Sequence, residues 1–337
     1  MTVLADRRRV ALRGALTALV TPFREDGEVD DRCLDGLVRW QVASGVAGLV
    51  PCGTTGEGAT LREEEHERVV ATVVEAAEGR VPVVAGCGTN DTRRTVAAAR
   101  RAASAGADAL LVVTPYYNKP NRSGMLSHYR AICEATALPV VVYNVPGRTG
   151  QNLGAEAILR LAEIPGVAGV KEASGSLEQI AMVLAARPEG FAVLSGDDAL
   201  ALPAVALGAD GLISVVSNEA PEEMAAMMAA ALEGDFGRAR EVHFRLLPLM
   251  RANFLETNPV PVKAAMEALG RARADVRAPL GPPEAATVAA VRTSASVNRG
   301  LSASGWGITS RRTRLRRNRR SRFDASSRQP RPRAESQ

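Results

Sequence analysis

Eight short apolar segments, each followed by a longer segment with helical periodicity, restrict how this chain can fold more than any other feature. They are rich in Val, Leu and Ala and occupy residues 14–23, 46–53, 81–88, 107–115, 138–146, 167–174, 191–198 and 210–218. Because their apolar residues are continuous rather than alternating, each strand is expected to be buried on both faces, as in a parallel sheet. The order predicts an α/β protein.

Eight β–α units in succession favour a closed (β/α)8 barrel, the TIM barrel, with additional C-terminal helices. A doubly wound open sheet is the alternative. Two glycine-rich turns, "GTTGEG" at 53–58 and "GCGTND" at 86–91, could suggest nucleotide binding. However, neither has the complete spacing of a dinucleotide fingerprint or the Gly-Lys-Ser/Thr of a phosphate loop. Nucleotide binding is therefore not favoured, and no cofactor is expected.

The composition divides the chain into four segments. We interpret residues 1–13 as an N-terminal extension, 14–218 as the barrel core and 219–290 as helices packed on the barrel. Residues 291–337 hold 13 arginines against two acidic residues and have no usable periodicity, so they are expected to be disordered or non-native. Clustered arginines attract phosphate, so an RNA-binding arm is another interpretation, although a nucleic-acid function is not favoured.

The cysteine and apolar content indicates a cytoplasmic protein without a metal site. Cys33, Cys52, Cys87 and Cys133 are widely separated, have no Cys-x-x-Cys spacing and have no histidine nearby in the sequence that would suggest zinc. No run of about 18 apolar residues suggests a membrane span. The first ten residues lack the apolar core of an export signal.

Lysine is rare in this chain. Of its 42 Lys and Arg residues, only three are lysines: Lys119, Lys171 and Lys263. Lys171 ends a predicted buried strand in "VAGVKEASG", and TIM barrels carry their chemistry at the C-terminal ends of the strands. An apolar environment disfavours the charged ammonium and lowers the pKa of lysine. The free amine can attack a ketone and form a Schiff base. A surface lysine at the strand end is the alternative.

Other predicted strand ends supply hydroxyl groups rather than metal ligands. Thr54 and Thr55 follow the second strand, Tyr117 follows the fourth, and Tyr143 ends the fifth. Tyrosine and threonine hydroxyls can relay the protons that Schiff-base chemistry requires. Packing at the barrel rim for the tyrosines and turn capping for the threonines are the alternatives, and Arg148 lies just beyond the fifth strand.

Six stretches, which follow one another from about residue 14 to 290, resemble those of the 4-hydroxy-tetrahydrodipicolinate synthase (dihydrodipicolinate synthase) family. They are "CGTTGEGATL", "VVTPYYNKP", "VVYNVPGRTG", "GVKEASG", "LSGDDALALPAVALGADGLISVVSN" and "NPVPVKAAMEALG". This family belongs to the class I pyruvate aldolase superfamily that also contains N-acetylneuraminate lyase. The resemblance covers nearly the whole chain before the arginine-rich segment.

The resemblance implies a role for each matching residue in the reacting centre. Lys171 would form the imine with pyruvate, and Tyr143 would be the acid/base residue beside it. Thr55 would link Tyr143 to Tyr117 in a proton relay, and the relay Tyr117 would come from a neighbouring subunit. Thr54 and Thr55 would also hold the pyruvate carboxylate.

The resemblance also implies the substrate-binding and regulatory groups. Arg148 would bind the carboxylate of the second substrate, L-aspartate 4-semialdehyde, and Gly196 and Ile213 would line the pyruvate pocket. The positions that bind the feedback inhibitor lysine in sensitive relatives correspond to Glu63, His66, Asn90, Arg94 and Tyr116. Arg94 stands where those relatives have a carboxylate, so weak inhibition by L-lysine, or none, is expected.

The implied activity is the condensation of pyruvate with L-aspartate 4-semialdehyde to 4-hydroxy-tetrahydrodipicolinate, in diaminopimelate and lysine biosynthesis. The implied assembly is a homotetramer built from two tight dimers. A related pyruvate-dependent aldolase or dehydratase acting on a sugar acid would share Lys171 and Tyr143 and is the main alternative. A catalytically silent binding barrel is the third interpretation, and it is less favoured because no residue needed for the imine is missing.

Overall fold

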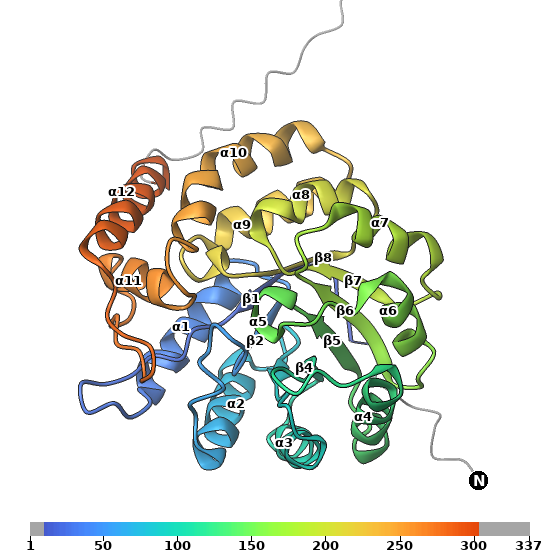
Figure 1. Cartoon of the computed structure of the whole chain (residues 1–337). Helices are drawn as coiled ribbons and strands as arrows, with labels where there is room; N and C mark the ends of the chain where they lie inside the picture. Colours follow the sequence, from blue (N-terminus) through green and yellow to red (C-terminus); the bar gives the residue numbers. More distant parts are fainter. Residues whose placement is uncertain (1–9, 303–337) are drawn as a thin grey trace, which may run out of the picture.

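The computed structural model describes residues 10–302, and its centre is a ring of eight parallel strands (Figure 1). The strands are β1 (Gly14–Ala18), β2 (Gly48–Val50), β3 (Val84–Gly86), β4 (Ala109–Val113), β5 (Val140–Asn144), β6 (Val167–Glu172), β7 (Ala192–Ser195) and β8 (Gly211–Ser214). Paired neighbours follow the order β2-β1-β8-β7-β6-β5-β4-β3. All eight strands fall within the predicted apolar segments, as expected for strands buried on both faces.

Contacts between β2 and β3 close this ring. The Leu49 amide donates to the Pro82 carbonyl at 2.9 Å, the Gly86 amide donates to the Pro51 carbonyl at 2.9 Å, and Leu49 forms a parallel bridge with Val83. An open doubly wound sheet would leave these two edges apart. The predicted (β/α)8 TIM barrel is therefore confirmed.

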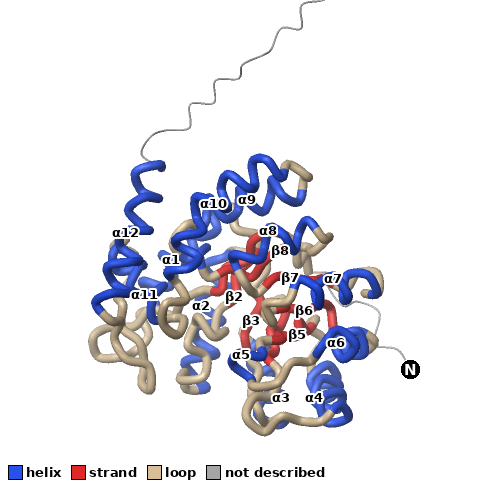
Figure 2. Tube along the Cα trace, turned by 45° about the horizontal axis from the view of Figure 1, so that its top comes forward, coloured by secondary structure: helices blue, strands red, loops and turns tan. Residues whose placement is uncertain are grey.

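Helices surround the ring of strands, as Figure 2 shows. They are α1 (Asp31–Ala43), α2 (Glu63–Ala77), α3 (Thr92–Ser104), α4 (Arg122–Ala135), α6 (Gly154–Ala162), α7 (Leu177–Ala186), α8 (Asp198–Ala206) and α9 (Pro221–Leu232). The short α5 (Pro146–Thr149) and the 3-10 turn η1 (Val216–Asn218) follow β5 and β8. Several helices begin at a side-chain cap, for example Asp91, which accepts from the Arg94 amide at 2.9 Å.

Two apolar layers hold the barrel together. One fills its interior and includes Leu16, Val141, Leu194 and Ile213, all completely buried. The other lies between strands and helices. Alternate residues of each strand supply the two layers, which explains why the sequence segments are continuously apolar. Packing of the interior layer fixes the relative positions of the strand ends, and therefore of the side chains that form the site.

The C-terminal region differs in detail from the prediction. Helix α9 follows β8 and packs against β1, so it completes the barrel instead of belonging to the additional helices. The additional helices are α10 (Phe236–Ala252), α11 (Val260–Ala268) and α12 (Ala285–Ser302). The boundary predicted at residue 291 is too early, because α12 continues through it and Val291 is completely buried against the neighbouring helices.

The rest of the arginine-rich segment, residues 303–337, lies outside the described residues, as do residues 1–9 of the predicted N-terminal extension. Within residues 10–302, no helix is long and apolar enough to cross a membrane, and no cluster of His, Cys, Asp and Glu could hold a metal ion. None of the four cysteines, all in the described part, forms a disulfide.

Candidate active site

Lys171 lies at the C-terminal end of β6, inside the barrel, with its side chain only 6% exposed. The strand register pairs it with Tyr143 of β5, and its Nζ lies 4.4 Å from the centre of the Tyr143 ring. Burial lowers the pKa of Lys171 to about 8; the charge of Asp198 opposes this shift and that of Arg148 adds to it. A substantial fraction of this amine is therefore neutral near physiological pH.

The room around Lys171 depends on Gly196, which follows β7. A Cβ at this position would lie 2.6 Å from the Ala173 Cβ and 3.1 Å from the Lys171 Cε. Any larger residue would therefore push against the lysine side chain. Ile213 of β8 is completely buried in the interior layer that also contains Tyr143, so it borders the same region of the barrel.

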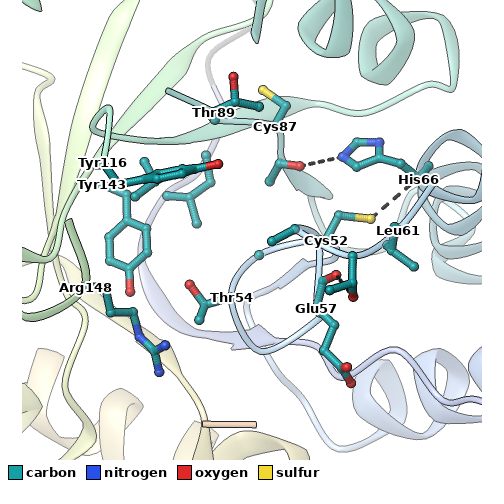
Figure 3. A pocket seen from close by; sticks show the side chains of 18 of the residues that line it. Cys52, Thr54, Glu57, Leu61, His66, Cys87, Thr89, Tyr116, Tyr143 and Arg148 are labelled. Atoms are coloured by element: carbon teal, nitrogen blue, oxygen red, sulfur yellow. Dashed lines mark hydrogen bonds between the residues drawn. The ribbon is translucent and has the colours of Figure 1, made fainter. Parts of the chain in front are cut away.

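Tyr143 carries a hydroxyl on the strand next to the lysine. Burial raises its pKa, although the charge of Arg148 and a hydrogen bond with Thr54 act in the opposite direction. A tyrosine that stays protonated and is linked to a second hydroxyl can deliver and recover a proton. Figure 3 shows Tyr143, Thr54 and Arg148 around one cavity.

The structure does not show the predicted link through Thr55: the turn threonine that affects Tyr143 is Thr54. Neighbouring side chains of the turn point in different directions, and of the two threonines only Thr54 lines the cavity. The Thr55 Oγ1 instead accepts from Asn258 Nδ2 at 2.9 Å. Thr54 is therefore the hydroxyl placed for a proton relay, and Thr55 is a buried part of the turn.

Tyr117, the other predicted relay residue, does not line this cavity within the chain. Its side chain is 89% exposed, and its backbone has a positive φ of 70°, which is uncommon for a bulky residue. The structure thus presents the Tyr117 ring outward on a constrained loop.

The cavity itself has a volume of 540 Å³. Arg148, from α5, borders it with Tyr143 and Thr54, and its Nη2 donates to the Asn258 carbonyl at 3.1 Å. Lys171 is not among the residues that line the cavity. Its amine lies against the ring of Tyr143, and Tyr143 does line the cavity. The volume is sufficient for small organic acids.

The five predicted regulatory residues line the other part of the same cavity. His66 is buried, its Nε2 lies 2.6 Å from the Gly86 carbonyl, and burial lowers its pKa. Glu63 is paired with Arg101 at 3.1 Å. Arg94 lines the same cavity, so this region holds two guanidinium groups and one carboxylate that is already paired.

L-Lysine is therefore expected to inhibit this chain weakly or not at all. The Arg94 guanidinium would repel the lysine ammonium, and Glu63 is already neutralised by Arg101. Inhibition curves for the unchanged protein and for Arg94→Glu test this, with the substituted protein expected to be the more sensitive. Half-loss of activity of the unchanged protein at sub-millimolar lysine would refute the expectation.

Sequence reasoning missed the residues that support the site from the C-terminal region. These are Asn258, which contacts both Thr55 and Arg148, and the buried ion pair between Lys263 and Glu57. The stretch "NPVPVKAAMEALG" contains two of them, but nothing in its spacing indicates contact with a turn some 200 residues earlier.

A buried lysine with a lowered pKa at the end of a TIM-barrel strand, in contact with a tyrosine, defines the class of Schiff-base-forming aldolases and lyases. The comparison with known proteins narrows this class. The chain belongs to the Dihydrodipicolinate synthetase family, whose model matches residues 11–297.

Relatives and solved structures agree with this membership. The chain is 51% identical over 274 residues to the 4-hydroxy-tetrahydrodipicolinate synthase of Maridesulfovibrio salexigens, covering 81% of this chain and 94% of the relative. It is 53% identical over 272 residues to that of Koribacter versatilis, covering 80% and 91%. The dihydrodipicolinate synthase structure from Thermotoga maritima matches with a TM-score of 0.83 and 42% identity, over 85% of this chain and 99% of that one.

Proposed function

We propose that this chain condenses pyruvate with L-aspartate 4-semialdehyde to 4-hydroxy-tetrahydrodipicolinate, a step of diaminopimelate and lysine biosynthesis. The relatives that carry this activity in their names match over more than nine-tenths of their own length. The single observation that carries the proposal is the buried amine of Lys171, with its lowered pKa, against the ring of Tyr143. Steady-state assays that compare L-aspartate 4-semialdehyde with sugar-derived aldehydes test it.

The reaction begins when the neutral Lys171 amine adds to the C2 carbonyl of pyruvate. Loss of water from the carbinolamine gives the imine, which makes the C3 protons acidic. Removal of one C3 proton gives an enamine, whose carbon attacks the aldehyde of the second substrate. The amino group of that substrate then adds to the imine carbon and displaces Lys171, which closes the ring and regenerates the enzyme.

We assign Tyr143 to move protons in these steps, because its ring lies against the Lys171 amine and Thr54 of the turn affects its hydroxyl. It can protonate the oxygen that leaves as water and later take up a proton from C3. Burial holds its pKa high, so it starts the cycle as the acid. The backbone amides of the turn at 53–56 and the Thr54 hydroxyl support binding of the pyruvate carboxylate.

Arg148 supports recognition of the second substrate, since its planar guanidinium suits a carboxylate and lines the cavity. Arg148→Ala is expected to leave formation of the pyruvate adduct on Lys171 intact while lowering kcat/KM for L-aspartate 4-semialdehyde about 10²-fold, as loss of a charged hydrogen-bond donor can. Borohydride trapping and steady-state kinetics measure the two effects separately. Equal loss of both would show that Arg148 acts on pyruvate instead.

The assembly we propose is a homo-oligomer, a tetramer of two tight dimers, in the cytoplasm. The outward-facing ring of Tyr117 supports it, because that ring can join the relay only in a neighbouring subunit. Among similar structures, one is described as a monomeric dihydrodipicolinate synthase variant, with 43% identity and a TM-score of 0.83. Assembly therefore varies among similar proteins.

A further inference from the structure

The turn that carries Thr54 is held in an unusual backbone conformation. The flanking residues Cys52 and Glu57 have positive φ values of 56° and 53°, although neither is glycine. Such residues persist in this region only where the surrounding structure enforces it. Gly58 shows how tightly the turn is wound, because a Cβ there would lie 2.1 Å from the Cys52 carbonyl oxygen. Something outside the turn must therefore hold it.

One anchor is a buried ion pair with helix α11. The Lys263 Nζ donates to Glu57 Oε1 at 2.5 Å, and the two side chains are 0% and 1% exposed. The other carboxylate oxygen, Oε2, accepts from the Arg277 amide at 2.8 Å. The Phe23 ring lies 4.1 Å from Lys263 Nζ and shields the pair. Separating two such charges is unfavourable, so Glu57 keeps the C-terminal end of the turn in place.

A second anchor is Asn258, which lies just before α11 and is 5% exposed. Its side-chain Nδ2 donates to Thr55 Oγ1 at 2.9 Å, in the middle of the turn. Its backbone carbonyl accepts from Arg148 Nη2 at 3.1 Å. This one residue therefore contacts both the turn beside the reacting centre and the arginine proposed for the second substrate.

We propose that Asn258 and Lys263 are positioning residues that hold the turn at 53–58 from helix α11 and from the segment just before it. They act through Thr55 and Glu57, which keep Thr54 against Tyr143 and the turn amides facing the cavity. The Lys263 amine is engaged by Glu57 and is not a second imine-forming group. This inference rests on the proposed function, since pyruvate must be the ligand that the turn receives.

Asn258→Ala tests the anchor in the middle of the turn. Loss of the hydrogen bond to Thr55 is expected to raise the KM for pyruvate about tenfold, while the adduct still forms on Lys171. The Arg148 contact is to the backbone carbonyl of residue 258 and remains, so the KM for L-aspartate 4-semialdehyde should change much less. This split between two substrates is not expected from a general loss of stability.

Asn253→Ala is the matched control. Asn253 is also buried and donates from Nδ2 to Glu219 Oε2 at 2.9 Å, but it does not line the cavity. Its loss is expected to lower Tm by a similar amount and to leave the KM for pyruvate unchanged. Both variants are assayed well below the lower of the two Tm values.

The ion pair is tested by comparing Lys263→Met with the double variant Glu57→Gln, Lys263→Met. The single variant leaves a buried unpaired carboxylate and should lower both Tm and pyruvate binding. The double variant removes that charge and should recover Tm, yet the KM for pyruvate should stay raised at least about tenfold because the ion pair no longer holds the turn. Recovery of both together would show that Lys263 is only structural.

Borohydride trapping of pyruvate by the unchanged protein distinguishes failure of the proposed function from failure of the positioning role alone. If the unchanged protein forms no adduct with pyruvate and borohydride, the proposed function itself fails, and this inference fails with it. If the adduct forms but Asn258→Ala binds pyruvate as the unchanged protein does, the positioning role alone is overturned. A raised KM for pyruvate in Asn258→Ala but not in Asn253→Ala supports it.

Discussion

Lys171→Met is expected to lower kcat/KM by at least about 10⁴-fold, the scale on which loss of a covalent nucleophile acts. Methionine has a similar length and suits the apolar surroundings that leave Lys171 only 6% exposed. The variant should therefore fold normally and yet lack the amine that attacks pyruvate. Because no other described lysine reaches Tyr143, nothing in the described part of the chain should replace it.

Lys119→Met is the matched control for this loss, since Lys119 is exposed and lies on the loop between β4 and α4. It is expected to keep the activity and the Tm of the unchanged protein. Steady-state turnover of pyruvate and L-aspartate 4-semialdehyde, with far-UV circular dichroism as a check of folding, measures both variants. A folded Lys171→Met protein with activity comparable to the unchanged protein would contradict the assignment.

Tyr143→Phe has the second largest expected effect, a fall in kcat of about 10²–10⁴-fold, as is typical when a general acid–base group is removed. The phenyl ring keeps the packing against Lys171 and in the interior layer of the barrel. The Tyr143 hydroxyl, which Thr54 affects, is lost, so protons must reach the carbinolamine and C3 without a positioned donor. The adduct with pyruvate should still form on Lys171, but more slowly.

Tyr129→Phe offers a comparison that removes an equally buried tyrosine hydroxyl. The Tyr129 hydroxyl donates to the Val112 carbonyl at 2.9 Å, outside the cavity, so its loss should lower Tm and spare kcat. Single-turnover measurements of adduct formation, followed by steady-state kinetics, separate the proton steps from binding. If the two variants lose the same small amount of activity, Tyr143 does not transfer protons in this reaction.

The barrel was predictable because the burial of its strands determines the pattern of apolar residues in the sequence. Strands buried on both faces must be continuously apolar, and eight such segments separated by amphipathic helices leave few alternatives. The position of Lys171 followed from the same rule, since a lysine after an apolar strand lies at the end where barrels place their chemistry. The residue types at the strand ends then indicated the Schiff-base chemistry.

The orientation of the turn at 53–58 was not predictable in the same way. The choice between Thr54 and Thr55 depends on the positive φ values of Cys52 and Glu57 and on contacts with Asn258 and Lys263. Those contacts join residues 203 and 206 positions apart in the chain. No local periodicity reports such a pairing, because the fold alone brings α11 to the turn.

The C-terminal boundary was misplaced for a related reason. The composition changes at about residue 291, and arginine and serine become frequent there. Helix α12 nevertheless continues to Ser302, and Val291 in its first half packs against the neighbouring helices while the adjacent Arg292 and Thr293 are exposed. Composition averaged over a segment does not distinguish an amphipathic helix from a segment without a fold.

Reduction by borohydride in the presence of pyruvate, followed by peptide mass spectrometry, tests most directly whether a desolvated lysine in the barrel is the group that reacts. We predict that the peptide containing Lys171 gains the mass of a reduced pyruvate adduct, and that this gain disappears in Lys171→Met. An adduct on Lys119 or Lys263 instead, or no adduct in the unchanged protein, would contradict the mechanism.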